Sequence, residues 1–141
     1  MAEVFGVAAS ALAVIELSAK VATLCLQYSN DVKGARDDIA RLQKEITNLQ
    51  ALSESVKGLL DGPHKERLEA SQQLRDNLNG SRLQLERLNN ELTPSKERQV
   101  MRRVGLRALK WPFKAQDVED EVKSLGRSMR HISDTLQVIQ T

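Results

Sequence analysis

This sequence of 141 residues has few aromatic residues, a single cysteine and nearly equal numbers of acidic and basic residues. Phe, Trp and Tyr together make up 3% of the chain, whereas 40% of its residues are hydrophobic and 28% are charged. A composition rich in Leu, Ala, Glu, Lys and Arg, with few aromatics and few β-branched runs, is typical of helical bundles rather than sheets. The composition therefore predicts an all-α protein.

The single cysteine bears on the cellular compartment of the protein, and the small net charge bears on the partners that it could bind. Cys25 cannot form an internal disulfide, which suits a reducing cytosol, and we expect it to be a small apolar side chain in a packed helix. The net charge of +2 gives no argument for a nucleic-acid partner. The acid at Glu3 stands where a secretory signal would have basic residues. We therefore expect a cytoplasmic protein that does not bind nucleic acid.

The motifs of common enzyme classes are also missing. The sequence has neither GxxxxGK[ST] nor a GxGxxG following a strand, so nucleotide chemistry is not predicted. His64 and His131 lie far apart without the cysteines or paired carboxylates of a zinc site. His131, Ser133 and Asp134 are the residue types of a hydrolase triad, but near-consecutive helical residues point in different directions. The sequence therefore predicts a non-enzymatic protein without a metal or cofactor.

Apolar periodicity and turn residues divide the chain into helices. The predicted helices cover residues 2–28, 31–60, 63–92, 95–110 and 115–139. Turn and cap residues in 29–34 separate the first two helices, Asp61-Gly62-Pro63 separates the next two, and a kink or break is expected at Asn79-Gly80. These elements predict an antiparallel helical bundle of four long helices plus a shorter basic helix, forming one domain over residues 1–141.

Two of the predicted helices carry long 3-4 apolar repeats. The second helix has Ile39, Leu42, Ile46, Leu49, Leu52 or Ser53, Val56 and Leu59, and the last has Val118, Val122, Leu125, Met129, Ile132, Leu136 and Ile139. A repeat of this kind packs a bundle core, but it also allows coiled-coil assembly. Oligomerisation through these helices therefore stays open.

The first predicted helix is the most apolar segment of the chain, with only Glu3, Glu16 and Lys20 charged. Five of its polar residues fall near one narrow strip, namely Ser10, Glu16, Lys20, Thr23 and Gln27, and almost all the others are apolar. A helix with so thin a polar strip is expected to be buried nearly all round, as the central core helix of a bundle.

The same helix is long enough to cross a bilayer. Residues 4–26 would span about 35 Å. Their apolar side chains contribute about −3 to −6 kcal/mol to membrane insertion, while Glu16 and Lys20 oppose it by roughly 5 to 7 kcal/mol. The sum is near zero, so the helix suits a soluble core by default and a membrane when partners assist. Glu16 and Lys20, four residues apart, could pair.

A basic stretch precedes the last helix. It contains Lys96, Arg98, Arg102, Arg103, Arg107, Lys110 and Lys114, with Glu97 as its only acid, beside Trp111 and Phe113. Such a stretch suits anionic lipid headgroups. The alternative is a solvated helix whose charges meet the acids of residues 117–121, with the two aromatic residues packing the end of the bundle.

Three segments carry a resemblance to a known family. They are MAEVFGVAASALAVIELSAKVATLC, SNDVKGARDDIARLQKEITNLQ and LRALKWPFKAQDVEDEVKSLGR. Together they resemble the HeLo-like domain found at the N-terminus of fungal STAND proteins, and the likeness runs along essentially the whole chain. This family is similar to HeLo domains and to the four-helix bundle of mixed-lineage kinase-like pseudokinases.

The resemblance implies a cell-death effector domain of a fungal NOD-like receptor system. The expected partners are a NOD-like receptor or STAND module in cis or trans, an anionic membrane, and further copies of the chain on activation. The domain would move from the cytoplasm to the plasma membrane and permeabilise it through residues 2–26. The rival hypothesis is a helical signalling or oligomerisation module that does not involve membranes.

These expectations name two sets of site residues. The membrane-insertion residues are Val4, Phe5, Val7, Leu12, Val14, Ile15, Leu17, Val21 and Leu24. The anionic-lipid residues are Lys96, Arg98, Arg102, Arg103, Arg107 and Lys110.

Overall fold

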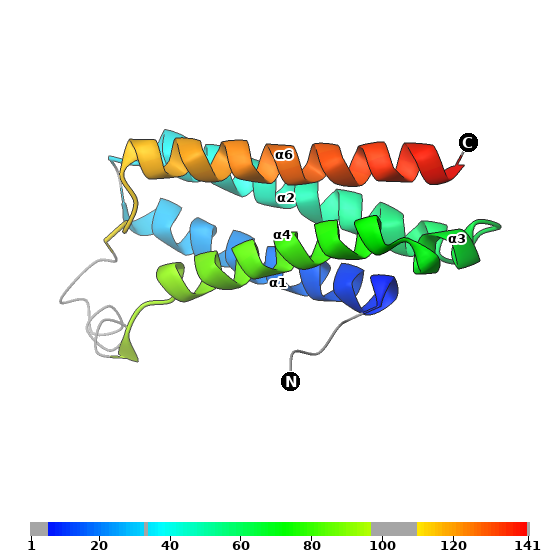
Figure 1. Ribbon diagram of the computed structural model, residues 1–141. Coiled ribbons are helices and arrows are strands. Elements are labelled where there is room, and N and C mark those ends of the chain that lie inside the picture. Colours follow the sequence, from blue (N-terminus) through cyan, green and yellow to red (C-terminus); the bar gives the residue numbers. More distant parts are fainter. Residues whose placement is uncertain (1–5, 33, 97–109, 141) are drawn as a thin grey trace.

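The computed structural model describes residues 6–32, 34–96 and 110–140, and within them the chain is all-α (Figure 1). The helices are α1 (Val7–Asp31), α2 (Arg36–Leu59), α3 (Lys65–Ala70), α4 (Gln72–Leu92) and α6 (Ala115–Gln140). The four long helices confirm the predicted bundle. The shorter basic helix predicted over 95–110 lies almost wholly outside the described residues.

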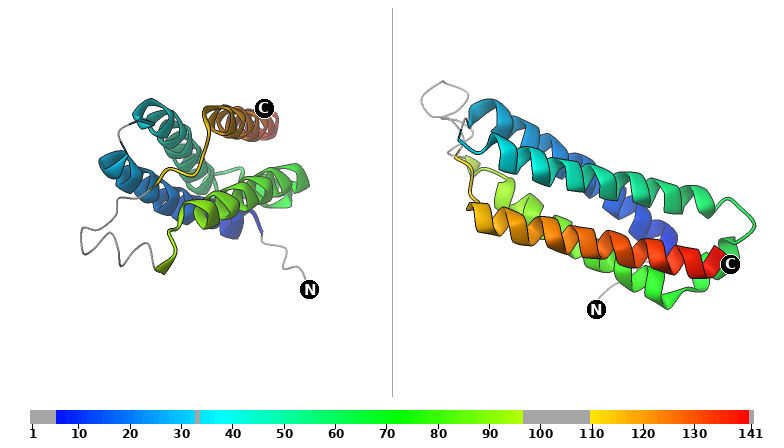
Figure 2. Two further views of the ribbon diagram at one scale, coloured as in Figure 1. Left: turned by 90° about the vertical axis from the view of Figure 1, so that its left-hand side faces the viewer. Right: turned by 90° about the horizontal axis from the view of Figure 1, so that it is seen from above.

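The long helices stand at the corners of a square. Helix α1 contacts α2 and α4, and α6 contacts the same two helices. Viewed from one end, α1 and α6 occupy opposite corners (Figure 2, left). Helices that follow one another along the chain run in opposite directions, so α1 is parallel to its neighbour α4 (Figure 1). The short α3 lies in the connection that brings the chain from α2 across to α4, on the opposite corner.

The predicted apolar stripes form the core. In α2 the buried residues are Ile39, Leu42, Ile46, Leu49, Ser53 and Val56. The sequence left open whether Leu52 or Ser53 faces the core, and Ser53 does. In α6 they are Val118, Leu125, Ile132, Thr135, Leu136 and Ile139, with Val122 and Met129 partly buried against them. The stripes in these two helices therefore fill the interior of the bundle, as their 3-4 spacing predicts.

The boundary between α1 and α2 differs from the prediction. Helix α1 continues to Asp31 rather than ending near Tyr28, and it stops where Val32 becomes extended. Helix α2 then begins at Arg36 rather than at Asp31. Asp37 and Asp38 lie in its first turn, where negative charge is favoured by the helix dipole. The polar residues before Val32 thus prolong the first helix instead of capping the second.

The predicted kink at Asn79-Gly80 is also wrong. Gly80 lies inside α4, and the break falls at Ser71, whose backbone is extended between α3 and α4. The Ser71 hydroxyl accepts a hydrogen bond from the Leu74 amide at 3.2 Å. This cap satisfies an amide at the start of α4, which makes Ser71 a better place to restart a helix than Gly80.

Candidate functional site: the two faces of helix α1

Helix α1 presents two opposite rows of side chains, each repeating at alternating steps of four and three residues. The inner seam is Val7, Ala11, Val14, Ser18, Val21, Cys25 and Tyr28, and every member is buried. The outer seam is Ala9, Leu12, Glu16, Ala19, Thr23 and Leu26, and every member is exposed. The prediction that this helix is buried nearly all round is therefore wrong. A helix at the corner of a square touches two neighbours, so its far side meets solvent.

Apart from Tyr28 at its end, the inner seam is made of small side chains and valines. The largest fully buried side chains of the described residues are Ile39, Leu42, Ile46, Leu49, Leu68, Leu74, Leu78, Leu85, Leu88, Leu92, Leu125 and Ile132. None of these belongs to α1, whereas α1 leaves Leu12 41% exposed and Leu26 52% exposed. Helix α1 thus contributes little bulk to the core and holds two large aliphatic side chains outside it.

The predicted membrane-insertion residues are divided between the two faces. Val7, Val14 and Val21 are buried in the core. Ile15, Leu17 and Leu24 are half-buried at the flanks, and Leu12 is exposed. Val4 and Phe5 lie outside the described residues. By length and composition alone, the stretch Val7–Asn30 is long and apolar enough to span a membrane. In the bundle, 33% of its most apolar segment is buried.

Among the described residues, side-chain hydrogen bonds join α1 to α4 near each end of the pair. Ser10, predicted on the polar strip, is buried instead and donates from Oγ to Oδ1 of Asn79 at 3.1 Å. The Tyr28 hydroxyl donates to the carbonyl oxygen of Leu92 at 2.7 Å. Between them, the buried Ser18 hydroxyl has no hydrogen-bond partner within the described ranges. The contact of α1 with α4 therefore depends on these two hydrogen bonds and on the small side chains of the inner seam of α1.

The only cysteine is part of the inner seam. Cys25 is buried, as expected, and burial raises the pKa of its thiol to about 12. Because the thiolate is the reactive form, this thiol is inert while α1 stays packed.

A shallow pocket of about 330 Å³ lies between α1 and α4 on the outside of the bundle. Glu16 and Lys20 of α1 line it together with Arg82 and Glu86 of α4. Arg82 and Glu86 form an ion pair at 2.6 Å. Within the described part of the chain no ion pair joins Glu16 to Lys20, so the pairing considered from their spacing is absent. Because α1 and α4 run parallel, the two helices carry charges of opposite order along this groove.

The predicted anionic-lipid residues are described at two positions only. Lys96 and Lys110 are exposed. Arg98, Arg102, Arg103 and Arg107 lie outside the described residues. The acids suggested as their alternative partners have other contacts: Asp117 accepts from the Lys114 amide at 2.9 Å, and Glu119 pairs with Arg41 at 2.6 Å.

An aromatic cluster closes the end of the bundle next to that stretch. Trp111 is 9% exposed, and its ring meets Tyr28 and Phe113 edge-on at centroid distances of 5.3 and 5.2 Å. The indole Nε1 is buried without a hydrogen-bond partner among the described residues. Trp111 and Phe113 therefore pack the bundle end, which is one of the two roles that the sequence left open for them.

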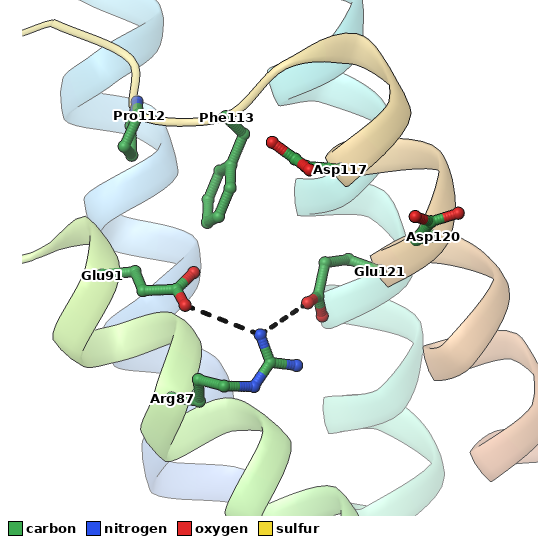
Figure 3. Close-up of a pocket in the computed structure, with 7 residues that line it drawn as sticks. All are labelled: Arg87, Glu91, Pro112, Phe113, Asp117, Asp120 and Glu121. Carbon is green, nitrogen blue, oxygen red and sulfur yellow. Dashed lines mark ion pairs between the residues drawn. The ribbon is translucent and has the colours of Figure 1, made fainter.

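Beside this cluster lies a pocket of about 460 Å³ (Figure 3). Arg87 of α4 sits at its base, with Glu121 of α6 at 2.7 Å and Glu91 at 3.7 Å. The hydrogen bond to Glu121 raises the pKa of the Arg87 guanidinium. Phe113 lies over these charges from the segment before α6. The pocket also includes Pro112, Asp117 and Asp120, so its lining carries more acids than bases.

Sequence reasoning missed this network. It considered the acids of residues 117–121 only as alternative partners of the basic stretch, yet the Glu121 side chain is 12% exposed and also accepts from Nε2 of Gln84 at 2.8 Å. The one available signal was position, because Glu121 stands next to Val122 of the apolar seam. The network joins α4 to α6, because Arg87 and Gln84 of α4 both bind the Glu121 carboxylate.

No catalytic or metal-binding arrangement is visible in the described ranges. They hold no group of three or more His, Cys, Asp or Glu side chains that could ligate a metal. His131, Ser133 and Asp134 are all exposed on α6. The features that distinguish this molecule are therefore surfaces, above all the outer face of α1.

Comparison with known proteins adds no relative: no family model, no curated protein and no solved structure matches the chain.

Proposed function

We propose that this chain is a non-enzymatic cell-death effector domain that permeabilises membranes through α1 after oligomerisation. The observation that carries the proposal is the arrangement of α1, with small residues inward and large aliphatic residues outward. A helix that served only as core would place Leu12 and Leu26 inside, because burying each contributes about 1.5 to 3 kcal/mol.

The packing of α1 supports a conditional release. Its inner seam buries three valines, one alanine, one cysteine and one tyrosine among its apolar residues, which together stabilise its docking by about 10 kcal/mol. Release also uncovers the leucines of α2 and α4 behind it. Detachment therefore needs a compensating apolar environment, which a bilayer or neighbouring copies can supply.

The charges on the outer side of α1 explain why copies are needed. Glu16 and Lys20 are exposed to solvent in the bundle, and each opposes insertion of an isolated helix by about 2.5 to 3.5 kcal/mol. Several inserted helices can turn these side chains toward one another and away from lipid. Clustering is therefore the step that makes insertion favourable.

The basic stretch supports contact with anionic lipid. Lys96 and Lys110 are exposed, and Lys110 precedes Trp111, whose ring contacts Tyr28 near the end of α1. Each cation near an anionic surface contributes about 1 kcal/mol. We include Arg98, Arg102, Arg103 and Arg107 in this surface on their charge alone. The resemblance to HeLo-like domains adds a fungal NOD-like receptor or STAND module as the clustering partner, and the plasma membrane as the target.

A disulfide lock tests the release of α1 directly. The side chains of Ser10 and Asn79 already meet, so the variant Ser10→Cys/Asn79→Cys should tie α1 to α4 when oxidised. We expect the full chain, clustered by a fused inducible dimeriser, to release dye from anionic vesicles when reduced and to fail when oxidised. Ser10→Cys alone is the control and should leak under both conditions.

Two outcomes would contradict the proposal. Equal leakage from the oxidised, verified disulfide would show that α1 does not leave the bundle. An absence of leakage from the clustered natural sequence, on vesicles rich in anionic lipid, would remove the membrane activity and favour the signalling module.

A further inference from the structure

We propose that the outer seam of α1 is a self-complementary interface through which two copies of this chain pair, α1 against α1 in antiparallel orientation. The seam is defined above as Ala9, Leu12, Glu16, Ala19, Thr23 and Leu26. The proposal goes beyond the proposed function, since it concerns the chain in solution without lipid.

The spacing of the outer seam is that of a helix–helix contact. Its six residues follow alternating steps of three and four, which keep one stripe facing a partner helix over several turns. All six are exposed, and Leu12 and Leu26 are among the large hydrophobic residues that remain outside the core. The Thr23 hydroxyl donates to the Ala19 carbonyl at 2.9 Å, so this polar group already has a partner within the helix. The seam is thus a second packing stripe without a partner helix in the described bundle.

The order of large and small residues favours a second copy as the partner. In an antiparallel pair centred between residues 17 and 18, Leu26 of one copy lies opposite Ala9 of the other. Leu12 lies opposite Thr23, and Glu16 lies opposite Ala19. Each larger side chain therefore meets a smaller one, which is the knobs-into-holes requirement for close packing.

The charges agree with the same arrangement. Reversing the direction of the second helix brings Glu16 of each copy beside Lys20 of the other. The groove next to the seam carries the opposite order, Arg82 before Glu86, on the parallel helix α4. The two-fold axis repeats this pair, so two contacts between Glu16 and Lys20 form across the α1–α1 interface. Neither helix presents a block of one sign that would repel its copy.

A dimer of this kind covers Leu12 and Leu26. A paired chain would therefore withhold from lipid the aliphatic residues that the free chain exposes. Its existence is measured without membranes, so failure of this inference and failure of the proposed membrane activity are separate results.

Sedimentation equilibrium of the full chain, with the natural sequence and variants, tests the pairing. We expect a concentration-dependent dimer that Leu12→Glu or Leu26→Glu weakens at least about tenfold, since either change puts a carboxylate into the apolar contact twice. Val138→Glu is the matched control, because Val138 is 72% exposed on α6, which lies at the opposite corner from α1. It should leave the dimer unchanged. A chain that is monomeric at every concentration, or a control that weakens the dimer equally, would overturn the inference.

Charge reversal tests the register. Glu16→Lys alone, or Lys20→Glu alone, places like charges across the interface and should weaken the dimer, whereas the double variant E16K/K20E should restore it. A double variant as weak as the singles would overturn the proposed register.

Cross-linking tests the orientation. In the antiparallel pair the two copies of residue 19 lie about 5 Å apart along the helix axis, and the two copies of residue 9 lie about 26 Å apart. Ala19→Cys should therefore cross-link with a short bifunctional reagent, and Ala9→Cys should not. Cross-linking of both variants would show a parallel pair and overturn the antiparallel arrangement. If the chain is monomeric and Leu12→Glu instead reduces vesicle binding, a bilayer is the occupant of the seam and the dimer proposal is wrong.

Discussion

The hydrogen bond from Tyr28 to Leu92, near the end of α1, offers the sharpest test of whether this helix opens independently of the other three long helices. Tyr28→Phe removes the hydrogen bond to the Leu92 carbonyl, 2.7 Å long and buried, but keeps a ring that can pack against Trp111. Losing one such bond and leaving a buried carbonyl unpaired costs about 1 to 2 kcal/mol. That range corresponds to an opening constant raised about 5- to 30-fold.

Hydrogen exchange measured by mass spectrometry, peptide by peptide, reads out that opening. If α1 detaches as a unit, its amides exchange faster by about this factor in Tyr28→Phe, while the amides of α6 keep their rate. Thr135→Val is the matched control: Thr135 is also buried, and it accepts a hydrogen bond from Asn77 at 3.3 Å between α4 and α6. We expect this control to accelerate exchange in α6 more than in α1.

The result that would refute the reasoning is uniform acceleration. If Tyr28→Phe speeds exchange in α1 and α6 by one common factor, then α1 opens only when the whole bundle unfolds. A release mechanism that leaves the other three helices in place would then have no support.

Three further predictions follow from the same structure. Leu85→Ala should lower the free energy of unfolding in urea by about 3 to 5 kcal/mol, because it empties a fully buried site, whereas Val14→Ala should lower it by only about 1 to 2 kcal/mol; equal losses would contradict the small contribution of α1 to the core. Cys25 should react with a thiol reagent at neutral pH far more slowly than an exposed cysteine, because burial raises its pKa to about 12, and fast labelling of the native chain would argue against the packed inner seam. Hydrogen bonding to Arg41 lowers the pKa of Glu119 below its ordinary value of 4.5. The stabilisation of the fold by this ion pair is therefore present above pH 4.5 and is lost as pH falls through the lowered pKa. The difference in unfolding free energy between the natural chain and Glu119→Gln should vanish in acid, and a difference that persists there would exclude the ion pair as its cause.

Several parts of the fold follow from local sequence patterns. The apolar stripes of α2 and α6 recur at 3-4 spacing, and a helix with one such stripe has only one way to turn when it packs. Their buried faces could therefore be predicted for most positions, whereas the choice between Leu52 and Ser53 was left to the packing of the bundle. The presence of a first helix long enough to span a bilayer was equally readable, since it depends only on length and composition.

The orientation of α1 was decided by the tertiary structure. This helix is apolar on nearly every side, so its own pattern cannot say which side faces inward. The large leucines of α2 and α4 occupy the interior, and the space left beside them accepts small side chains such as Ala11, Val14 and Ser18. Close packing therefore turns Leu12 and Leu26 outward.

The same distinction applies to polar groups. A hydroxyl or carboxylate becomes structural only when another helix brings it a partner, as Asn79 does for Ser10 and Gln84 does for Glu121. Such partners lie dozens of residues away and leave no periodic trace in the sequence. What the sequence determined by itself was a set of helices and their core stripes. The square packing alone decided that the most apolar helix would stand at a corner with a complete seam facing solvent, because a corner helix has neighbours on only two sides.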